Sequence, residues 1–259
     1  MTQDERRRFL IQYLLREEPQ YAHIAIPKTE LEQRQLLRGL MNIRLPKKIG
    51  EDFLSVQDEY LQTELKNKGI TDAETLPVLP GDLVLWQGDI TTLHCDGIVN
   101  AANSRLLGCF HPCHGCIDNA IHTYAGVQLR LVCAEIMQKQ GQAEAVGSAK
   151  ITPAFNLPSR YVLHTVGPIV AGALTETHER QLTACYRSCL QLAEEYGLRS
   201  LAFCCISTGE FHFPPKRAAE IALQTVRTWK AQTHSTMKVI FNVFTKSDEQ
   251  IYKRQLGIH

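Results

Sequence analysis

Three cysteines and two histidines crowd into eight residues of this 259-residue chain, in the stretch Cys-Phe-His-Pro-Cys-His-Gly-Cys that ends at Cys116. Thiolate and imidazole groups suit Zn²⁺, and a zinc ion that takes part in chemistry keeps three protein ligands and one open position. Pro112 and Gly115 allow the chain to fold back between the outer cysteines. The stretch therefore predicts a zinc site, although a loop of free thiols or a purely structural zinc would show the same residue types. The candidate ligands are Cys109, His111, Cys113, His114 and Cys116.

Two short polar motifs precede this stretch, Gly88-Asp89-Ile90-Thr91 and Asn100-Ala101-Ala102-Asn103. The carboxylate of Asp89 could accept a hydrogen bond from an amino group such as that of adenine, and Asn103 could bond to a sugar hydroxyl. Each also has a plainer interpretation, because Asp and Asn are frequent in turns and at helix caps.

A third polar loop, Ile206 to Pro214, follows the apolar stretch SLAFCC and precedes an amphipathic helix pattern. Ser, Thr and Gly between a strand and a helix can turn several backbone N–H groups toward an anion. Gly209 would let the backbone approach a phosphate without a Cβ clash. The same composition also occurs in turns that only connect elements.

The elements that must position these loops alternate between strand and helix from about Leu79 onward. Alternation of this kind predicts an α/β fold with helices on both faces of the sheet. Ligands of such sheets bind beyond the carboxyl ends of the strands, where the polar loops lie. The predicted strands are LVLWQGDI, GIVNAAN, AKITPAF, RYVLHTV, SLAFCCIST and KVIFNVFT, and the predicted helices cover residues 117–139, 176–196, 215–230 and 248–256.

The composition changes near residue 76, and the preceding residues show only helical patterns, at 4–17, from Thr29 to about Ile43, and at 51–67. We therefore expect two parts, a helical N-terminal extension over residues 1–75 and a main domain over residues 76–259. Nothing in the extension looks catalytic. It could pack as a cap on the main domain or dock a partner.

Composition and charge limit the compartment in which we expect the protein and the partners that we expect it to bind. A net charge of +1 with 21% charged and 44% hydrophobic residues gives no case for nucleic-acid or membrane-surface binding. The N-terminal residues lack a secretory apolar segment, and no apolar run is long enough to span a bilayer, so we expect a cytoplasmic protein. In a reducing compartment the nine cysteines are thiols, metal ligands or buried apolar groups. The pattern places Cys185, Cys189, Cys204 and Cys205 in the core.

Taken together, GDIT, NAAN, HTVGP at 164–168 and STG with Pro214 resemble a macro domain in order and spacing, over roughly residues 80–259. The resemblance implies a three-layer α/β/α sandwich with a mixed sheet that binds ADP-ribose. It puts adenine at Asp89 and the distal ribose at Asn103, with Phe244 stacking on adenine unless it is a core residue. The implied ADP-ribose contacts are Asp89, Ile90, Asn103, Asp118, Asn119, Ser207, Thr208, Gly209, Glu210, Phe211 and Phe244.

The stretch after NAAN departs from the glycine-rich loop of MacroD-like hydrolases. Asp-Asn-Ala-Ile-His stands where that branch has Asp-Gly-Cys-Ile-His, so Asp118 matches the catalytic aspartate. The Cys/His loop is similar to that of zinc-dependent bacterial macro domains, whose ligand set implies Cys109, His114 and Cys116. His111 and Cys113 fall at variable positions of that pattern.

The resemblance implies a zinc-dependent hydrolase that removes mono-ADP-ribose from protein side chains, with an Asp or Glu linkage expected and Asp118 orienting or deprotonating water. A non-catalytic ADP-ribose-binding module with a structural zinc is the alternative. The family context also implies a lipoyl-carrier protein of the glycine-cleavage type as a substrate and a link to a sirtuin-type ADP-ribosyltransferase. His122 and His164 are expected to be mainly core residues, whereas Glu210 could orient substrate or water.

Overall fold

A six-stranded sheet organises the main part of the protein in a computed structural model that describes residues 1–21 and 23–258. Its neighbouring strands are parallel except for the last pair, which is antiparallel, so the sheet is mixed as predicted. In spatial order the strands are β2 (Leu83–Gln87), β8 (Lys238–Val243), β7 (Ser200–Phe203), β4 (Gly97–Ala102), β6 (Tyr161–Val166) and β5 (Ala149–Pro153).

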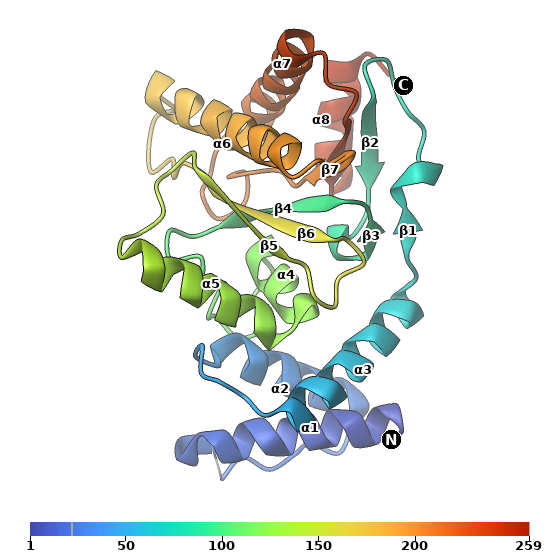
Figure 1. Ribbon diagram of the computed structural model, residues 1–259, viewed down its shortest axis with the longest axis vertical. Helices are drawn as coiled ribbons and strands as arrows, with labels where there is room; N and C mark the ends of the chain where they lie inside the picture. Colours follow the sequence, from blue (N-terminus) through green and yellow to red (C-terminus); the bar gives the residue numbers. More distant parts are fainter. Residues whose placement is uncertain (22, 259) are drawn as a thin grey trace.

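Helices cover both faces of this sheet (Figure 1). On one face lie α4 (Ile117–Ala125) and α5 (Val127–Gln140). On the other lie α6 (Glu176–Glu195), α7 (Pro215–Thr233) and α8 (Lys246–Leu256). The predicted three-layer α/β/α sandwich is confirmed. The single helix expected over 117–139 is instead two, because Gly126 breaks it with a φ of 95°, a conformation that glycine adopts without strain.

The central strands are nearly continuous apolar runs because both of their faces are covered by helices. Ile98 and Val99 of β4 and Val162 and Leu163 of β6 have no exposed surface. Since β2, β8, β7, β4 and β6 run in the same direction, their carboxyl ends meet at one edge of the sheet. The polar loops predicted to carry the site follow β2, β4, β7 and β8 and therefore gather at that edge.

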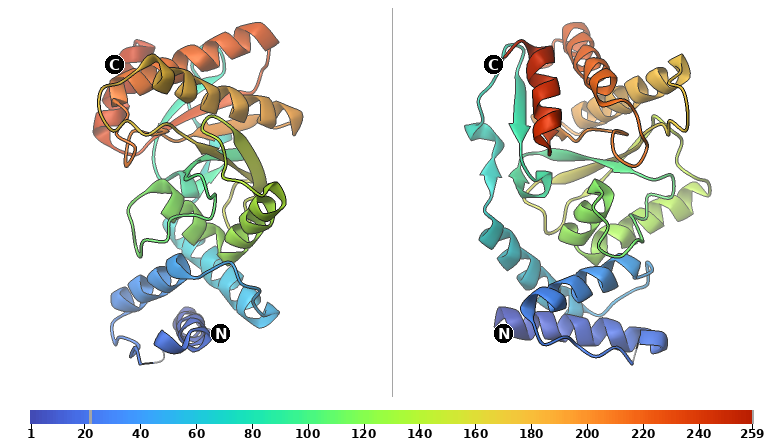
Figure 2. Two further views of the ribbon diagram at one scale, coloured as in Figure 1. Left: turned by 90° about the vertical axis from the view of Figure 1, so that its left-hand side faces the viewer. Right: turned by 180° about the vertical axis from the view of Figure 1, so that it is seen from behind.

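Three further helices, α1 (Gln3–Glu17), α2 (Glu30–Ile43) and α3 (Glu51–Lys68), lie together beyond α4 and α5, at the end of the molecule farthest from α7 (Figures 1 and 2). They share an apolar cluster of their own, which Val127 of α5 joins. The remaining elements are short, namely β1 (Thr71–Asp72) paired with β3 (Leu93–His94), and the 3₁₀ helices η1 (Pro19–Tyr21), η2 (Ala73–Thr75) and η3 (Ile90–Thr92).

Within the described ranges, no helix combines the length and the apolar character that crossing a bilayer requires. The cysteines predicted to lie in the core do so in three cases, since Cys185, Cys189 and Cys204 are buried. Cys205 is only half-buried and lines the cleft described below.

Candidate functional site

A cleft of about 960 Å³ opens at the carboxyl edge of the sheet. The loops that follow neighbouring parallel strands form it together with the chain segment before α4. Residues that are far apart in the sequence therefore meet there. Ten of the eleven residues expected to contact ADP-ribose line this cleft, together with all three expected metal ligands. They are Asp89, Ile90, Asn103, Cys109, His114, Cys116, Asp118, Ser207, Thr208, Gly209, Glu210, Phe211 and Phe244.

At one end of the cleft, Asp89 is held by its own turn. Its Oδ1 accepts hydrogen bonds from the backbone N–H of Thr91 at 3.0 Å and from the Thr91 hydroxyl at 2.6 Å. Its Oδ2 lies 3.5 Å from the ammonium of Lys68, the last residue of α3. Phe244 lies just past the end of β8 with 74% of its surface exposed, so the core alternative for this residue is wrong. The cleft thus presents both a hydrogen-bond acceptor and an exposed aromatic ring.

The loop over residues 207–211 lines the cleft. Ser207 has a φ of 64°, and its buried hydroxyl has no hydrogen-bond partner among the described protein groups. Gly167, of the HTVGP motif, packs against it so closely that a Cβ there would lie 2.0 Å from Ser207 Oγ. A Cβ at Gly209, by contrast, would meet no atom within 4 Å. Gly167 therefore supports the loop at Ser207, whereas the space next to Gly209 is open.

Asp118 lies in the first turn of α4 and is almost fully buried. Two side-chain amides hold its carboxylate, with Asn100 Nδ2 at 2.8 Å from Oδ1 and Asn103 Nδ2 at 3.2 Å from Oδ2. Burial raises the pKa of Asp118 to about 6, although both amides and the charge of Arg130 act in the opposite direction. The carboxylate is thus fixed in orientation at the floor of the cleft.

His122 and His164 lie behind Asp118 and are core residues, as expected. His122 Nε2 is 3.6 Å from Asp118 Oδ1, but burial lowers the pKa of this histidine well below its ordinary value, so the ring is neutral and the contact is not an ion pair. His164 Nδ1 accepts from Asn100, which leaves its Nε2–H to face Thr152 Oγ1 at 3.0 Å. Neither histidine lines the cleft.

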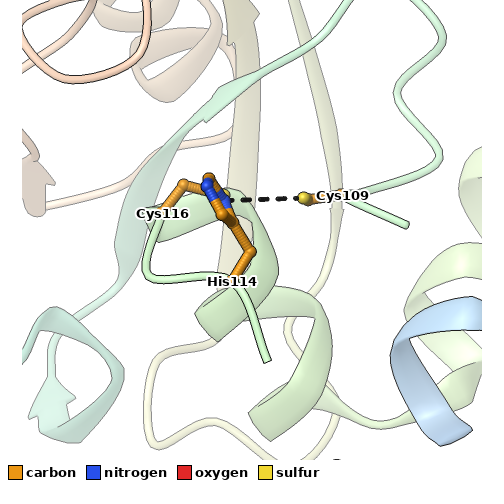
Figure 3. Close-up of side chains that lie close together, drawn as sticks. All are labelled: Cys109, His114 and Cys116. Carbon is orange, nitrogen blue, oxygen red and sulfur yellow. Dashed lines mark hydrogen bonds between the residues drawn. The ribbon is translucent and has the colours of Figure 1, made fainter. Parts of the chain in front are cut away.

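The candidate ligands Cys109, His114 and Cys116 converge from the segment 109–116, which we call the metal loop (Figure 3). Their ligand atoms lie within 4.8 Å of one another, and Cys109 Sγ is 3.7 Å from His114 Nδ1. The other two candidates, His111 and Cys113, are exposed and lie outside this group. Two sulfur atoms and one imidazole nitrogen at this separation fit a tetrahedral zinc ion with one further position.

Burial raises the pKa of the Cys116 thiol to about 12. A thiolate at this position therefore needs a compensating positive charge. Metal binding supplies such a charge and releases the thiol proton.

Asn119, the eleventh residue expected at ADP-ribose, is fully buried and does not line the cleft. Its side chain faces Arg38 and the backbone of His111 instead.

Three residues that contact the site were not predicted from the sequence. They are Arg38 and Lys68 from the N-terminal helices, and Asn100 beneath Asp118. Asn100 lay in the NAAN motif, whereas nothing in the sequence pattern pointed to the two basic residues.

Comparison with known proteins assigns the class. Residues 99–222 match the family model described as Macro domain, and the chain belongs to the macro domain family. It is 58% identical to a protein of Treponema medium named Protein-ADP-ribose hydrolase, over 99% of this chain and all of that one. A Staphylococcus aureus protein of the same name is 48% identical over 95% of this chain and 92% of its own length.

A solved structure has the same fold. The Trypanosoma brucei macrodomain in complex with ADP-ribose matches with a TM-score of 0.66 and 31% identity, over 85% of this chain and 95% of that one.

Proposed function

We propose that this protein is a hydrolase that releases mono-ADP-ribose from modified protein side chains, with a zinc ion held by Cys109, His114 and Cys116. One observation carries the proposal. The metal loop and the buried carboxylate of Asp118 lie in the same cleft as the predicted ADP-ribose contacts. A module that only reads ADP-ribose needs neither a metal nor a carboxylate at the distal ribose.

Different residues of the cleft would bind different parts of ADP-ribose. Asp89 would accept from the adenine amino group while Phe244 stacks on the ring, and the backbone of the 207–211 loop would bind the phosphates. Asn103 already donates to Asp118, and would bring the distal ribose next to that carboxylate. The anomeric carbon would then lie close to the metal loop.

In the proposed reaction Asp118 orients a water molecule and accepts its proton as the water oxygen bonds to the anomeric carbon. The bond from that carbon to the modified side chain breaks, and its electron pair leaves with the side chain. When bound at its three ligands, zinc supplies Lewis acidity beside the distal ribose. Asn100 and Asn103 keep the carboxylate aimed through both its oxygens.

The linkage we propose is an ester to Asp or Glu. A carboxylate departs more readily than an amide or an arginine nitrogen, so it needs no strong general acid. The neutral, buried His122 and His164 do not line the cleft and so offer no such acid. A carrier protein of the lipoyl type, modified by a sirtuin-type transferase, remains our proposal for the substrate.

A time course with two substrates tests the activity and the linkage together. The protein should release ADP-ribose from a protein modified on acidic residues and leave an arginine-linked one intact. Release from the arginine-linked protein alone would refute the linkage. If neither substrate were cleaved while calorimetry showed ADP-ribose binding, the protein would be a binding module.

A further inference from the structure

We propose that Arg38 of helix α2 is a positioning residue for the metal ligands His114 and Cys116, which makes the N-terminal helical region part of the functional site. This inference rests on the proposed zinc site. Arg38 also lines the cleft, although it lies 71 residues or more before the metal loop in the sequence.

The guanidinium of Arg38 binds two points on the segment that carries the ligands. Its Nη2 donates to the backbone carbonyl of His114 at 2.9 Å and to Asn119 Oδ1 at 2.8 Å, and its Nε lies 3.3 Å from the same oxygen. A planar guanidinium keeps its donors in fixed directions. The backbone of one ligand and the start of α4 are therefore held in a fixed relation.

Asn119 extends this contact to both sides of the loop. Its Nδ2 donates to the carbonyl of His111 at 3.0 Å, and its backbone N–H points at Cys116 Sγ at 3.4 Å. Among the described residues, the Thr123 hydroxyl is the one other group within reach of Asn119 Oδ1 besides Arg38, at 3.5 Å. Loss of Arg38 would leave this buried oxygen poorly satisfied and free the amide to turn away from the loop.

The same face of α2 holds the middle of the loop. Asn42 Oδ1 accepts from the backbone N–H of Cys113 at 2.9 Å, and Cys113 Sγ lies 3.3 Å from the carbonyl of Gln35. Positions 35, 38 and 42 follow helical spacing and so share one side of α2. Cys113 has a φ of 54°, which is unfavourable for a residue with a side chain and needs support from its surroundings.

The metal loop has little structure of its own to replace these contacts. Within residues 109–116, which the structure describes in full, one backbone hydrogen bond closes a turn, from His114 N to His111 O at 3.3 Å. His111, Pro112, Cys113 and Gly115 are exposed. Contacts from outside the loop therefore help to hold the three ligands together, and α2 supplies those described above.

The experiment measures zinc affinity in the full-length protein by competition with a chromogenic chelator. The variants are Arg38→Ala and Arg38→Gln. Glutamine favours a helix as arginine does, but its side chain is too short to reach the loop. Arg34→Ala is the matched control, because Arg34 lies one turn away on α2 and pairs with Glu30 and Glu64 without contacting the loop. The absorption spectrum at saturating Co²⁺ reports ligand geometry independently of affinity, and thermal unfolding checks that each variant is folded.

We expect both Arg38 variants to bind zinc 10- to 100-fold more weakly, the range typical for the outer partners of metal ligands, and to show altered cobalt bands. Arg34→Ala should match the wild type in both measurements. Unchanged affinity and cobalt bands in a folded Arg38→Gln protein would overturn the role of Arg38 and leave the zinc site standing. A wild-type protein that binds no zinc would instead refute the zinc site, and this inference with it.

Discussion

Glu210, in the loop after β7, faces His114 of the metal loop, with Glu210 Oε1 lying 3.6 Å from His114 Nε2. The other ring nitrogen, Nδ1, lies 3.7 Å from Cys109 Sγ. One nitrogen thus faces the proposed ligand group and the other faces a carboxylate. Histidines that bind metals commonly donate their second N–H to a carboxylate, which fixes the orientation of the ring.

Glu210→Gln should therefore weaken zinc binding, but by less than tenfold. The separation exceeds a hydrogen bond, and the Glu210 side chain is 67% exposed, so solvent reduces the effect of its charge. Chelator competition checks this against Glu176→Gln, which changes a highly exposed carboxylate on α6. A Glu210→Gln protein with wild-type zinc affinity but slower turnover would assign Glu210 to the substrate instead.

Gly209→Val should fold like the wild type and bind ADP-ribose at least tenfold more weakly. An added Cβ would meet no protein atom within 4 Å, so we expect the fold to tolerate a side chain here, yet that side chain would take up space that a bound phosphate needs. Calorimetry with ADP-ribose and a thermal unfolding curve measure the two effects separately. Unchanged affinity would mean that the phosphates do not approach this backbone.

Asp118→Ala should lower turnover by a factor of about 100 or more while ADP-ribose affinity changes by less than about tenfold. A general base accelerates a reaction by about 10²- to 10⁴-fold. Its contact with the attacking water is made only during the reaction, so its loss lowers turnover much more than ADP-ribose affinity. Initial rates and calorimetry on the same preparation measure the two effects. Because the substitution leaves the Asn100 and Asn103 amides without their carboxylate partner, a thermal unfolding curve checks that the variant is folded. Full activity in this variant would refute the role of Asp118.

The free energy of unfolding should fall as pH decreases from 6.5 toward 4, partly because of His164. Burial lowers the pKa of His164 to about 4 in the folded protein, while the unfolded chain titrates near 6.5. The unfolded state therefore binds a proton that the folded state excludes, and stability present above pH 6.5 is lost below it, by up to about 3 kcal/mol.

Denaturant titrations at several pH values check this against His164→Gln, which should show a shallower decrease. His122, Cys133 and Asp118 face the same buried region and remain in both proteins, so the difference in slope isolates His164. Equal slopes would show that His164 is protonated equally in the folded and unfolded states.

The sequence predicted the sandwich well because its strands are short apolar runs separated by polar loops with particular residue types. The antiparallel pairing of β5 at the sheet edge was not predicted, although only residues 154–160 join β5 to β6 and a connection this short cannot form a parallel crossover. The break at Gly126 was readable only as a glycine within a helical pattern. In the structure this glycine also packs close to Gln57 of α3, a contact that no local pattern contains.

The part of the site that comes from a single loop could be predicted from the sequence. Cys109, His114 and Cys116 are neighbours in sequence, so their residue types alone suggested a shared ion, and the structure brings them together. Arg38 lines the cleft and Lys68 contacts Asp89, and both come from helices that precede the cleft residues in the sequence. Their roles depend on how the N-terminal helices dock against α4, and single-sequence periodicity carries no record of that docking.

If zinc held by the metal loop is needed for release of ADP-ribose, removing the metal should stop the reaction and returning it should restart it. The purified full-length protein should contain about one equivalent of zinc by elemental analysis. Treatment with a chelator should abolish release from a protein modified on acidic residues while calorimetry still detects ADP-ribose binding, and one equivalent of zinc should restore the rate. A zinc-free protein that releases ADP-ribose at the full wild-type rate would show that the reaction does not need zinc.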